Sequence, residues 1–155
     1  HRLDDLLTGH ALKELILGDA VWSKTTFETL EPLASLTGLL SLSLLPKRID
    51  DGRIQPLGSL TNLENLRIPC NLFTTEQIAW LRARLHETVE SEALNALLRL
   101  TTPFDIDGKL RDVLLIGRRK PWLTSDQDAA RIHKHASKLE QLVANFRSDP
   151  SLDPE

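Results

Sequence analysis

The stretch NLENLRIPCNLF, residues 62–73, decides the fold that the sequence predicts. Its apolar residues Leu63, Leu66 and Ile68 have the spacing of a strand with one buried face, and Asn71 follows soon after them. Asparagine is a poor strand former, so its position indicates that the strand has ended and the chain turns. Backbone groups at such a corner lose their ladder partners, and an inward-facing amide can bond both N–H and C=O groups. We therefore expect Asn71 to close a buried corner.

The apolar spacing of this stretch recurs along the chain. PLASLTGLLSLSL, residues 32–44, and PLGSLTNLENLRI, residues 56–68, align without a gap, and both contain the pattern L-x-x-L-x-L. Weaker copies of this pattern begin at Leu12 and Leu110. Self-similarity at a fixed period of about 20 to 50 residues indicates stacked repeats, each of which contributes one structural unit. The expected strands lie near residues 13–17, 40–44, 64–68, 88–90 and 111–116.

This pattern resembles the leucine-rich repeat family, whose repeat reads L-x-x-L-x-L-x-x-N-x-L. Residues 63–73 fill every slot, and the resemblance is good over residues 12–73 and weak over residues 110–116. It implies an α/β fold, a short right-handed leucine-rich-repeat solenoid over residues 1–123 with a parallel concave sheet. The sequence departs from the family at the asparagine slot, so the corners of the other repeats must close differently. In those repeats the slot holds Ala20, Lys47 and Arg118.

Two helices are expected outside the strands. Thr74 and Gln77 form a capping-box signature at the start of the stretch TTEQIAWLRARLHE. Residues 124–146 are expected to form an amphipathic helix that caps the solenoid, because the open end of a repeat array exposes an apolar cross-section; a helix that docks on a partner is the alternative. Its apolar stripe is Ile132, Ala136, Leu139, Val143 and Phe146. Residues 147–155 form a polar, proline-bearing tail that is expected to be disordered.

Composition narrows the classes of partner and compartment. Leucine, with 32 residues, far exceeds isoleucine with 8 and valine with 4, which is unusual for an ordinary sheet protein. The formal net charge of -3 gives no overall attraction to nucleic acid or anionic membranes, and no apolar run approaches the ~20 residues of a membrane span. The single cysteine, Cys70, favours a cytoplasmic location. The chain lacks methionine and begins with His1, from which we expect the C-terminal piece of a longer protein.

No group of residues in the sequence points to catalysis. His133 and His135 are two positions apart, which places their rings on different faces of a helix, so they are expected to be solvated and to share no metal. The stretch DIDG, residues 105–108, lacks the later acidic ligands of a calcium loop and is expected to be a turn before a strand. Cys70 has no histidine base near it in sequence and is expected to be a small, buried, apolar residue. We expect a protein that is not an enzyme and holds neither cofactor nor metal.

The remaining surface with functional potential is the solvent-facing side of the concave sheet. If the leucines of each repeat face inward, the residues between them face outward. These outward positions mix apolar and polar groups, which suits recognition of a protein partner. The candidate binding residues are Glu14, Ile16, Ser41, Ser43, Leu45, Asn65, Arg67, Asp112, Leu114 and Ile116. The alternative is that the C-terminal helix or a neighbouring repeat covers them.

Non-catalytic protein recognition through the concave face is the predicted function, and three other functions stay open at this point. The chain could be the sensor end of a larger signalling or defence enzyme whose catalytic domain lies upstream. Lys47 and Arg48, together with residues 118–120, could form a basic edge for an anionic partner, although a solvated charge run is favoured over nucleic-acid binding. A purely structural role, as an end cap for other repeats, is the third. No motif identifies the partner or the oligomeric state.

Overall fold

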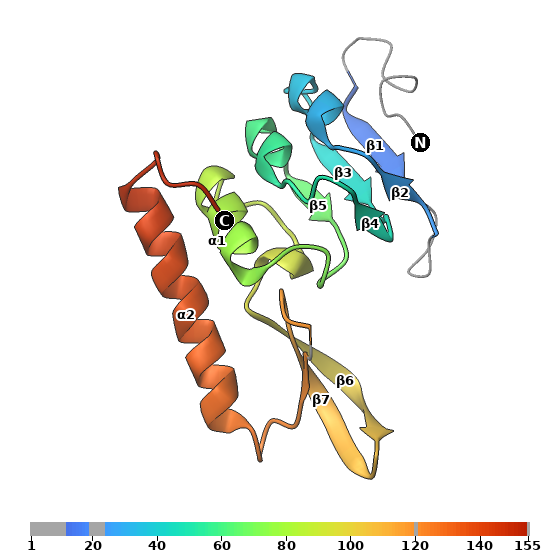
Figure 1. Cartoon of the computed structure of the whole chain (residues 1–155), viewed down its shortest axis with the longest axis vertical. Coiled ribbons are helices and arrows are strands. Elements are labelled where there is room, and N and C mark those ends of the chain that lie inside the picture. Colours follow the sequence, from blue (N-terminus) through green and yellow to red (C-terminus); the bar gives the residue numbers. More distant parts are fainter. Residues whose placement is uncertain (1–11, 19–23, 120, 155) are drawn as a thin grey trace.

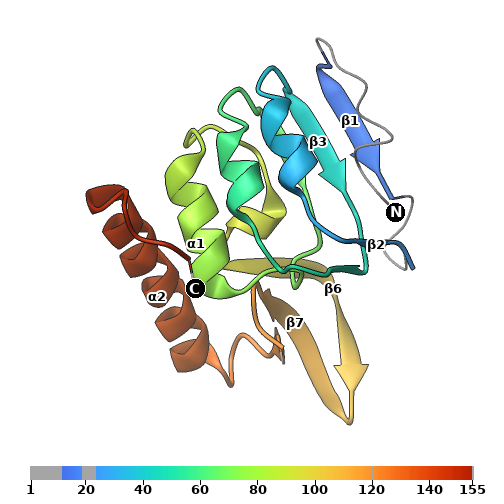
Figure 2. The same ribbon diagram turned by 45° about the horizontal axis from the view of Figure 1, so that its top comes forward.

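The computed structural model describes residues 12–18, 24–119 and 121–154 (Figure 1). In these ranges the chain is mixed α/β, with two α-helices and three small sheets. The N-terminal strands and the short helices that follow them are stacked in sequence order, and a long hairpin extends away from them (Figures 1 and 2). The candidate functional site lies on the stacked strands.

Three strands from the first half of the chain form a parallel sheet in the order β1-β3-β5. They are β1 (Glu14–Leu17), β3 (Ser41–Leu44) and β5 (Asn65–Arg67). Leu42 on the central strand lies opposite Leu15 on one side and opposite Leu66 on the other. Because side chains alternate along a strand, these leucines share one face, where Leu42 and Leu66 are buried in the main core and Leu15 packs against it. The three strands lie where the leucine spacing places them.

Short elements return the chain from one strand of this sheet to the next. A two-stranded parallel sheet contains β2 (Thr26–Phe27) and β4 (Arg48–Ile49). The 3-10 helices η2 (Glu31–Ser35) and η3 (Gln55–Ser59) follow these strands. Each has a proline in its first turn, where the fixed φ and the missing N–H are tolerated. Leu33 and Leu57 of these helices are fully buried and close the core on the side away from the sheet.

The helix α1 (Thr75–Arg84) follows β5 and begins with the capping box expected from the sequence. The N–H of Gln77 donates to the Thr74 hydroxyl (3.2 Å), and the N–H of Thr74 donates to the Gln77 side-chain oxygen (3.0 Å). This expectation is confirmed. Trp80 is buried against η3, and a Cβ at Gly58 would lie 2.5 Å from its ring. The glycine therefore allows η3 and α1 to approach closely.

The inward-facing role expected of Asn71 is wrong. Its side chain is exposed, in the turn between β5 and α1. The backbone of this corner is bonded by other groups: the N–H of Leu72 donates to Pro69 (3.2 Å), and the N–H of Gly117 donates to the carbonyl of Cys70 (2.9 Å). A local turn and the distant residue Gly117 therefore bond the backbone groups that the Asn71 amide was expected to bond.

The second half of the chain forms an antiparallel sheet in the order β6-β7-β8. Its strands are β6 (Leu97–Ile106), β7 (Lys109–Leu115) and β8 (Trp122–Leu123). Asp107 and Gly108, with φ angles of 53° and 75°, form the two-residue loop between β6 and β7. Asp-Gly is favoured in such loops because two positive φ angles match the twist of the flanking strands. The strand expected at residues 111–116 therefore pairs with a hairpin partner and not with the parallel sheet.

The leucine-rich-repeat solenoid predicted from the sequence is wrong, and the packing of one side chain shows it. The repeat alignment places Val113 beneath the same sheet as Leu42 and Leu66. In the structure Val113 lies in a second, smaller apolar cluster, separate from theirs. This cluster consists of Val113, Leu115, Leu123 and Ile132. Among the described residues, the parallel sheet continues past β5 only through one bridge, between Asn65 and Glu90, so the parallel stacking ends there.

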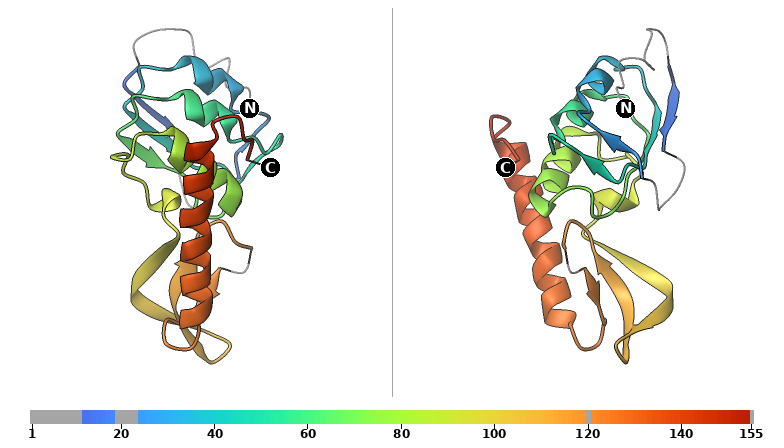
Figure 3. Two further views of the ribbon diagram at one scale, coloured as in Figure 1. Left: turned by 90° about the vertical axis from the view of Figure 1, so that its left-hand side faces the viewer. Right: turned by 45° about the vertical axis from the view of Figure 1, so that its right-hand side comes forward.

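The helix α2 (Ala129–Ser148) packs along α1 (Figure 3). Its apolar stripe connects the two clusters, because Ile132 belongs to the smaller one and Leu139 and Phe146 belong to the main core. An ion pair between Lys138 and Glu76 (2.8 Å) also links α2 to the first turn of α1. The predicted position of this helix, as a cap over the end or edge of the parallel sheet, is therefore wrong.

The ends of α2 also differ from the expected helix, residues 124–146. Ser125 lies outside the helix because its hydroxyl and its N–H both donate to the carboxylate of Asp112. The expected disordered tail is bound through its described residues: Gln55 donates to Asp153 (2.7 Å), and Arg84 donates to the carbonyl of Pro150. The tail therefore lies against η3 and α1.

One histidine of α2 contradicts the expectation of a solvated pair. His133 is exposed, but His135 is buried, and its Nε2 donates to the carbonyl of Ile116 (3.1 Å). Burial is the main cause that lowers the pKa of His135 below its ordinary value, and the charges of Arg118 and Lys138 lower it further. Hydrogen bonds to backbone carbonyls oppose this effect without reversing it. The folded protein therefore favours a neutral ring at the contact between α2 and the end of β7.

Replacing Gly117 by alanine should destabilise the fold more than replacing Gly108. Both glycines have a positive φ (79° and 75°), so both substitutions strain the backbone by about 1 kcal/mol. A Cβ at Gly117 would also lie 2.7 Å from the nitrogen of Thr75, whereas nothing lies within 4 Å of a Cβ at Gly108. Urea denaturation should therefore show an additional loss of about 1–3 kcal/mol for Gly117→Ala. Equal losses would mean that residue 117 does not approach the start of α1.

The free energy of unfolding should fall as the pH falls below about 6.5, the ordinary pKa of histidine. His135 has a lowered pKa in the folded state, so below this pH the unfolded state binds more protons. The loss can reach about 1.4 kcal/mol per pH unit. Denaturation at a series of pH values should give a flatter dependence for His135→Gln, whose amide can still donate to Ile116. His133→Gln should behave like the wild type, and an unchanged slope in His135→Gln would contradict the prediction.

Candidate functional site

The outward side of the β1-β3-β5 sheet, which we call the outer sheet face, carries the candidate functional site. Cross-strand pairing aligns its side chains in rows perpendicular to the strands. One row contains Glu14, Ser41, Asn65 and Glu90. The next row contains Ile16, Ser43 and Arg67. The first row is therefore polar with a carboxylate at each end, and the second changes from apolar to cationic across the sheet.

Two serines make a groove along the central strand of this face. Ser41 and Ser43 are small and half-buried, whereas the longer side chains of Ile16 and Arg67 lie on the strands to either side. The resulting depression has a volume of about 480 Å³. Its walls are two strand spacings apart, about 10 Å, which matches the width of one extended chain. Glu90 also lines it, beside β5.

Gly18 and Leu45 line the groove where β1 and β3 end. The N–H of Leu45 donates to the carbonyl of Leu17 (2.9 Å), and a Cβ at Gly18 would lie 2.7 Å from the carbonyl oxygen of Leu45. Gly18 also has a φ of 85°, which favours glycine. The side chain of Leu45 is largely buried, so this predicted binding residue shapes the end of the groove and offers little contact area of its own.

The outer sheet face exposes a large apolar side chain next to charged ones. Ile16 is 63% exposed, more than any other large apolar side chain among the described residues. Arg67 and Glu90 are exposed, and neither takes part in an ion pair in the part of the chain that the structure describes. An apolar group, a hydroxyl-lined groove and an unpaired guanidinium therefore lie side by side on three strands.

Seven of the ten predicted binding residues lie along this face, and the other three lie on β7 of the antiparallel sheet or just after it. Asp112 is on β7, where hydrogen bonds from Ser125 hold the pKa of its carboxyl below the usual range. Leu114 is on the same strand, paired with both β6 and β8. Ile116 is buried in the main core. The placement of these three on a concave sheet is wrong, because their strand forms a hairpin.

The predicted basic edge is split between different surroundings. Lys47 and Arg48 line a second cleft, beside β4. Arg118 lies elsewhere: a hydrogen bond from Lys138 is the main cause that lowers the pKa of Glu76 and burial is the main cause that lowers the pKa of His135, and the charge of Arg118 adds to both. Lys120 lies outside the described residues. Arg118 therefore belongs to the contact between α1 and α2 and takes no part in lining the second cleft.

Other reactive groups offer little chemistry. Cys70 is half-buried, and burial, followed by the charge of Glu92, raises the pKa of its thiol. A raised pKa keeps the thiol protonated and weakly nucleophilic. Across the described ranges, no group of three or more histidine, cysteine or acidic side chains could hold a metal ion. Neither helix in those ranges has the length and apolarity needed to cross a membrane.

Sequence reasoning missed Glu90 as part of the face and did not recognise the groove. The signal for the groove is present in the sequence: serines at both outward positions of the central strand leave a hollow between larger neighbours. The sequence pattern around Glu90 predicts its place on the face only weakly, because this residue joins the sheet through a single bridge and not through a full strand. Comparisons with protein-family models, curated proteins and solved structures give no match to this chain.

Proposed function

We propose that the protein is a non-catalytic recognition module that binds an extended segment of another protein along the groove of the outer sheet face. The exposure of Ile16 carries this proposal. A large apolar side chain that is 63% exposed beside a groove of matching width gains about 25 cal/mol per Å² when a partner covers it. Scattered apolar residues need no explanation, but this one borders a depression of about 480 Å³.

The charges on the face specify the chemistry of the partner. Arg67 presents an unpaired guanidinium that suits a carboxylate, with which it can make two parallel hydrogen bonds. Ser41 and Ser43 can donate to and accept from the backbone of a bound segment. The proposed ligand therefore carries an apolar side chain for Ile16 and, about 10 Å across the groove, an acidic one for Arg67.

The size of the groove indicates a modest affinity. Stable protein–protein interfaces bury about 1,200–2,000 Å² in total, more than one groove on a three-stranded sheet provides. We therefore expect an isolated segment to bind with a dissociation constant in the micromolar range, which corresponds to a binding free energy of about -8 kcal/mol. Residues of the partner outside the groove would add to this affinity.

Selection of displayed random peptides on the wild-type protein should enrich sequences that combine apolar and acidic residues. Ser43→Arg should weaken binding of the selected peptides about tenfold or more, because a long side chain fills the groove. The side chain of Ser43 is half-buried and faces outward, so the variant should still fold, which circular dichroism can verify. A selection repeated on Arg67→Glu should favour basic residues in place of acidic ones.

The matched control is Ser59→Arg, which makes the same change at an exposed serine at the end of η3. It should leave binding of the selected peptides unchanged. If no peptide is enriched, or if the enriched peptides bind wild type and Ser43→Arg equally, the groove is not a recognition site.

A further inference from the structure

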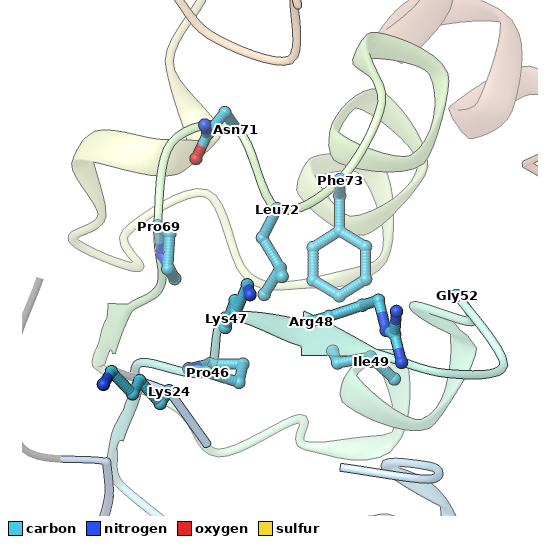
Figure 4. Close-up of a pocket in the computed structure, with 10 residues that line it drawn as sticks. All are labelled: Lys24, Pro46, Lys47, Arg48, Ile49, Gly52, Pro69, Asn71, Leu72 and Phe73. Carbon is cyan, nitrogen blue, oxygen red and sulfur yellow. The ribbon is translucent and has the colours of Figure 1, made fainter. Parts of the chain in front are cut away.

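A second cleft lies beside β4, on segments that the outer sheet face does not use (Figure 4). It has a volume of about 480 Å³. One side is formed by Lys47 and Arg48, next to Pro46, and the other by the turn over residues 69–73. Lys24 lies at one end of the cleft, on the same side as Pro46 (Figure 4). The cleft therefore lies between two successive units of the parallel stack.

The floor of this cleft is apolar. Ile49 and Phe73 are 6% and 4% exposed, and Leu72 is half-buried. In Figure 4 the side chains of Leu72 and Phe73 point from the turn toward β4. Pro46 is buried beside them and offers no N–H donor. A fully hydrated inorganic ion gains nothing from such a floor, whereas an apolar group does.

The rim of the cleft is cationic. Arg48 is partly neutralised, because its Nε and Nη2 each lie 2.8 Å from Asp50. In the part of the chain that the structure describes, Lys24 and Lys47 have no ion pair, and none of the residues that line the cleft is acidic. Two uncompensated ammonium groups thus border an apolar floor in a chain whose formal net charge is -3.

We propose that this cleft binds a small amphipathic organic anion, a molecule with an apolar body and a carboxylate, sulfonate or phosphate group. The apolar body would lie on Ile49, Leu72 and Phe73, and the anionic group would be bound by Lys24 and Lys47. Lysine acts as a mobile point charge and accepts any of these head groups. The volume falls within the 300–1,000 Å³ of typical small-molecule sites.

A nucleic-acid strand fits the cleft less well. Single strands are bound by stacking successive bases on several aromatic rings, whereas among the described residues Phe73 is the only aromatic residue that lines the cleft. An acidic peptide would satisfy the lysines, but it would leave the apolar floor uncovered unless it also carried an apolar side chain at the right position. A compact molecule with an apolar body and an anionic group contacts the apolar floor and the lysines at the same time.

Binding of anilinonaphthalene sulfonate, an apolar anion that fluoresces when bound, tests this proposal. Titration should show one saturable site per chain, weakened by added salt. Lys24→Glu and Lys47→Glu should each reduce the affinity about tenfold, because each removes a charge-assisted contact. Phenylnaphthylamine, which has the same rings without the sulfonate, should bind at least about tenfold more weakly than the sulfonate.

Two control variants separate this site from general effects. Lys134→Glu makes the same change of charge at an exposed lysine on α2 and should leave binding unchanged. Ile16→Asp alters the outer sheet face and should also leave it unchanged, so the result is independent of the proposed function. Competition with laurate and with lauryl phosphate then shows which head group is preferred.

Several outcomes would overturn the proposal. These are the absence of saturable binding, equal affinity for the charged and uncharged naphthyl probes, and equal losses in Lys47→Glu and Lys134→Glu. Displacement of the probe by an oligoglutamate peptide but not by laurate or lauryl phosphate would identify an acidic protein segment as the occupant and would also contradict it.

Discussion

The pairing of β3 with β1 on one side and with β5 on the other is the interaction on which the rest of the structure depends. It places Leu42 between Leu15 and Leu66 beneath the sheet. No single strand of three or four residues can bury its leucine alone, so each unit is stable only because the next one covers it. The buried leucines of the short 3-10 helices, together with Pro56, close the same core from the other side.

The same alternation that buries the leucines creates the candidate site. When Leu42 points inward, Ser41 and Ser43 point outward, and their small size leaves a hollow along the centre of the sheet. The cleft beside β4 has a related origin, because it lies where successive units diverge after their strands. Candidate binding surfaces therefore lie both on the face of the sheet and at the ends of its strands.

Sequence reasoning predicted local structure better than long-range pairing. The leucine spacing placed β1, β3 and β5, and the capping box placed the start of α1. Beyond α1 the predicted fold is wrong, because Asp107 and Gly108 connect two antiparallel strands of a hairpin and do not precede a parallel strand. Asn71 filled a family slot yet lies exposed, since a sequence pattern does not show which distant backbone, here that of Gly117, reaches a corner. The seven candidate residues that share the outer sheet face come from β1, β3 and β5 or directly follow β3, and the three that lie elsewhere come from β7 or directly follow it.

Methyl-to-methyl nuclear Overhauser contacts of Leu42 test the central claim most directly. In a sample with labelled leucine and valine methyl groups, Leu42 should show contacts with both Leu15 and Leu66, because the three lie side by side on adjacent strands. It should show none with Val113, which belongs to the separate cluster against α2. Contacts between Leu42 and Val113, or none between Leu42 and Leu66, would contradict this arrangement of the parallel strands and the groove that depends on it.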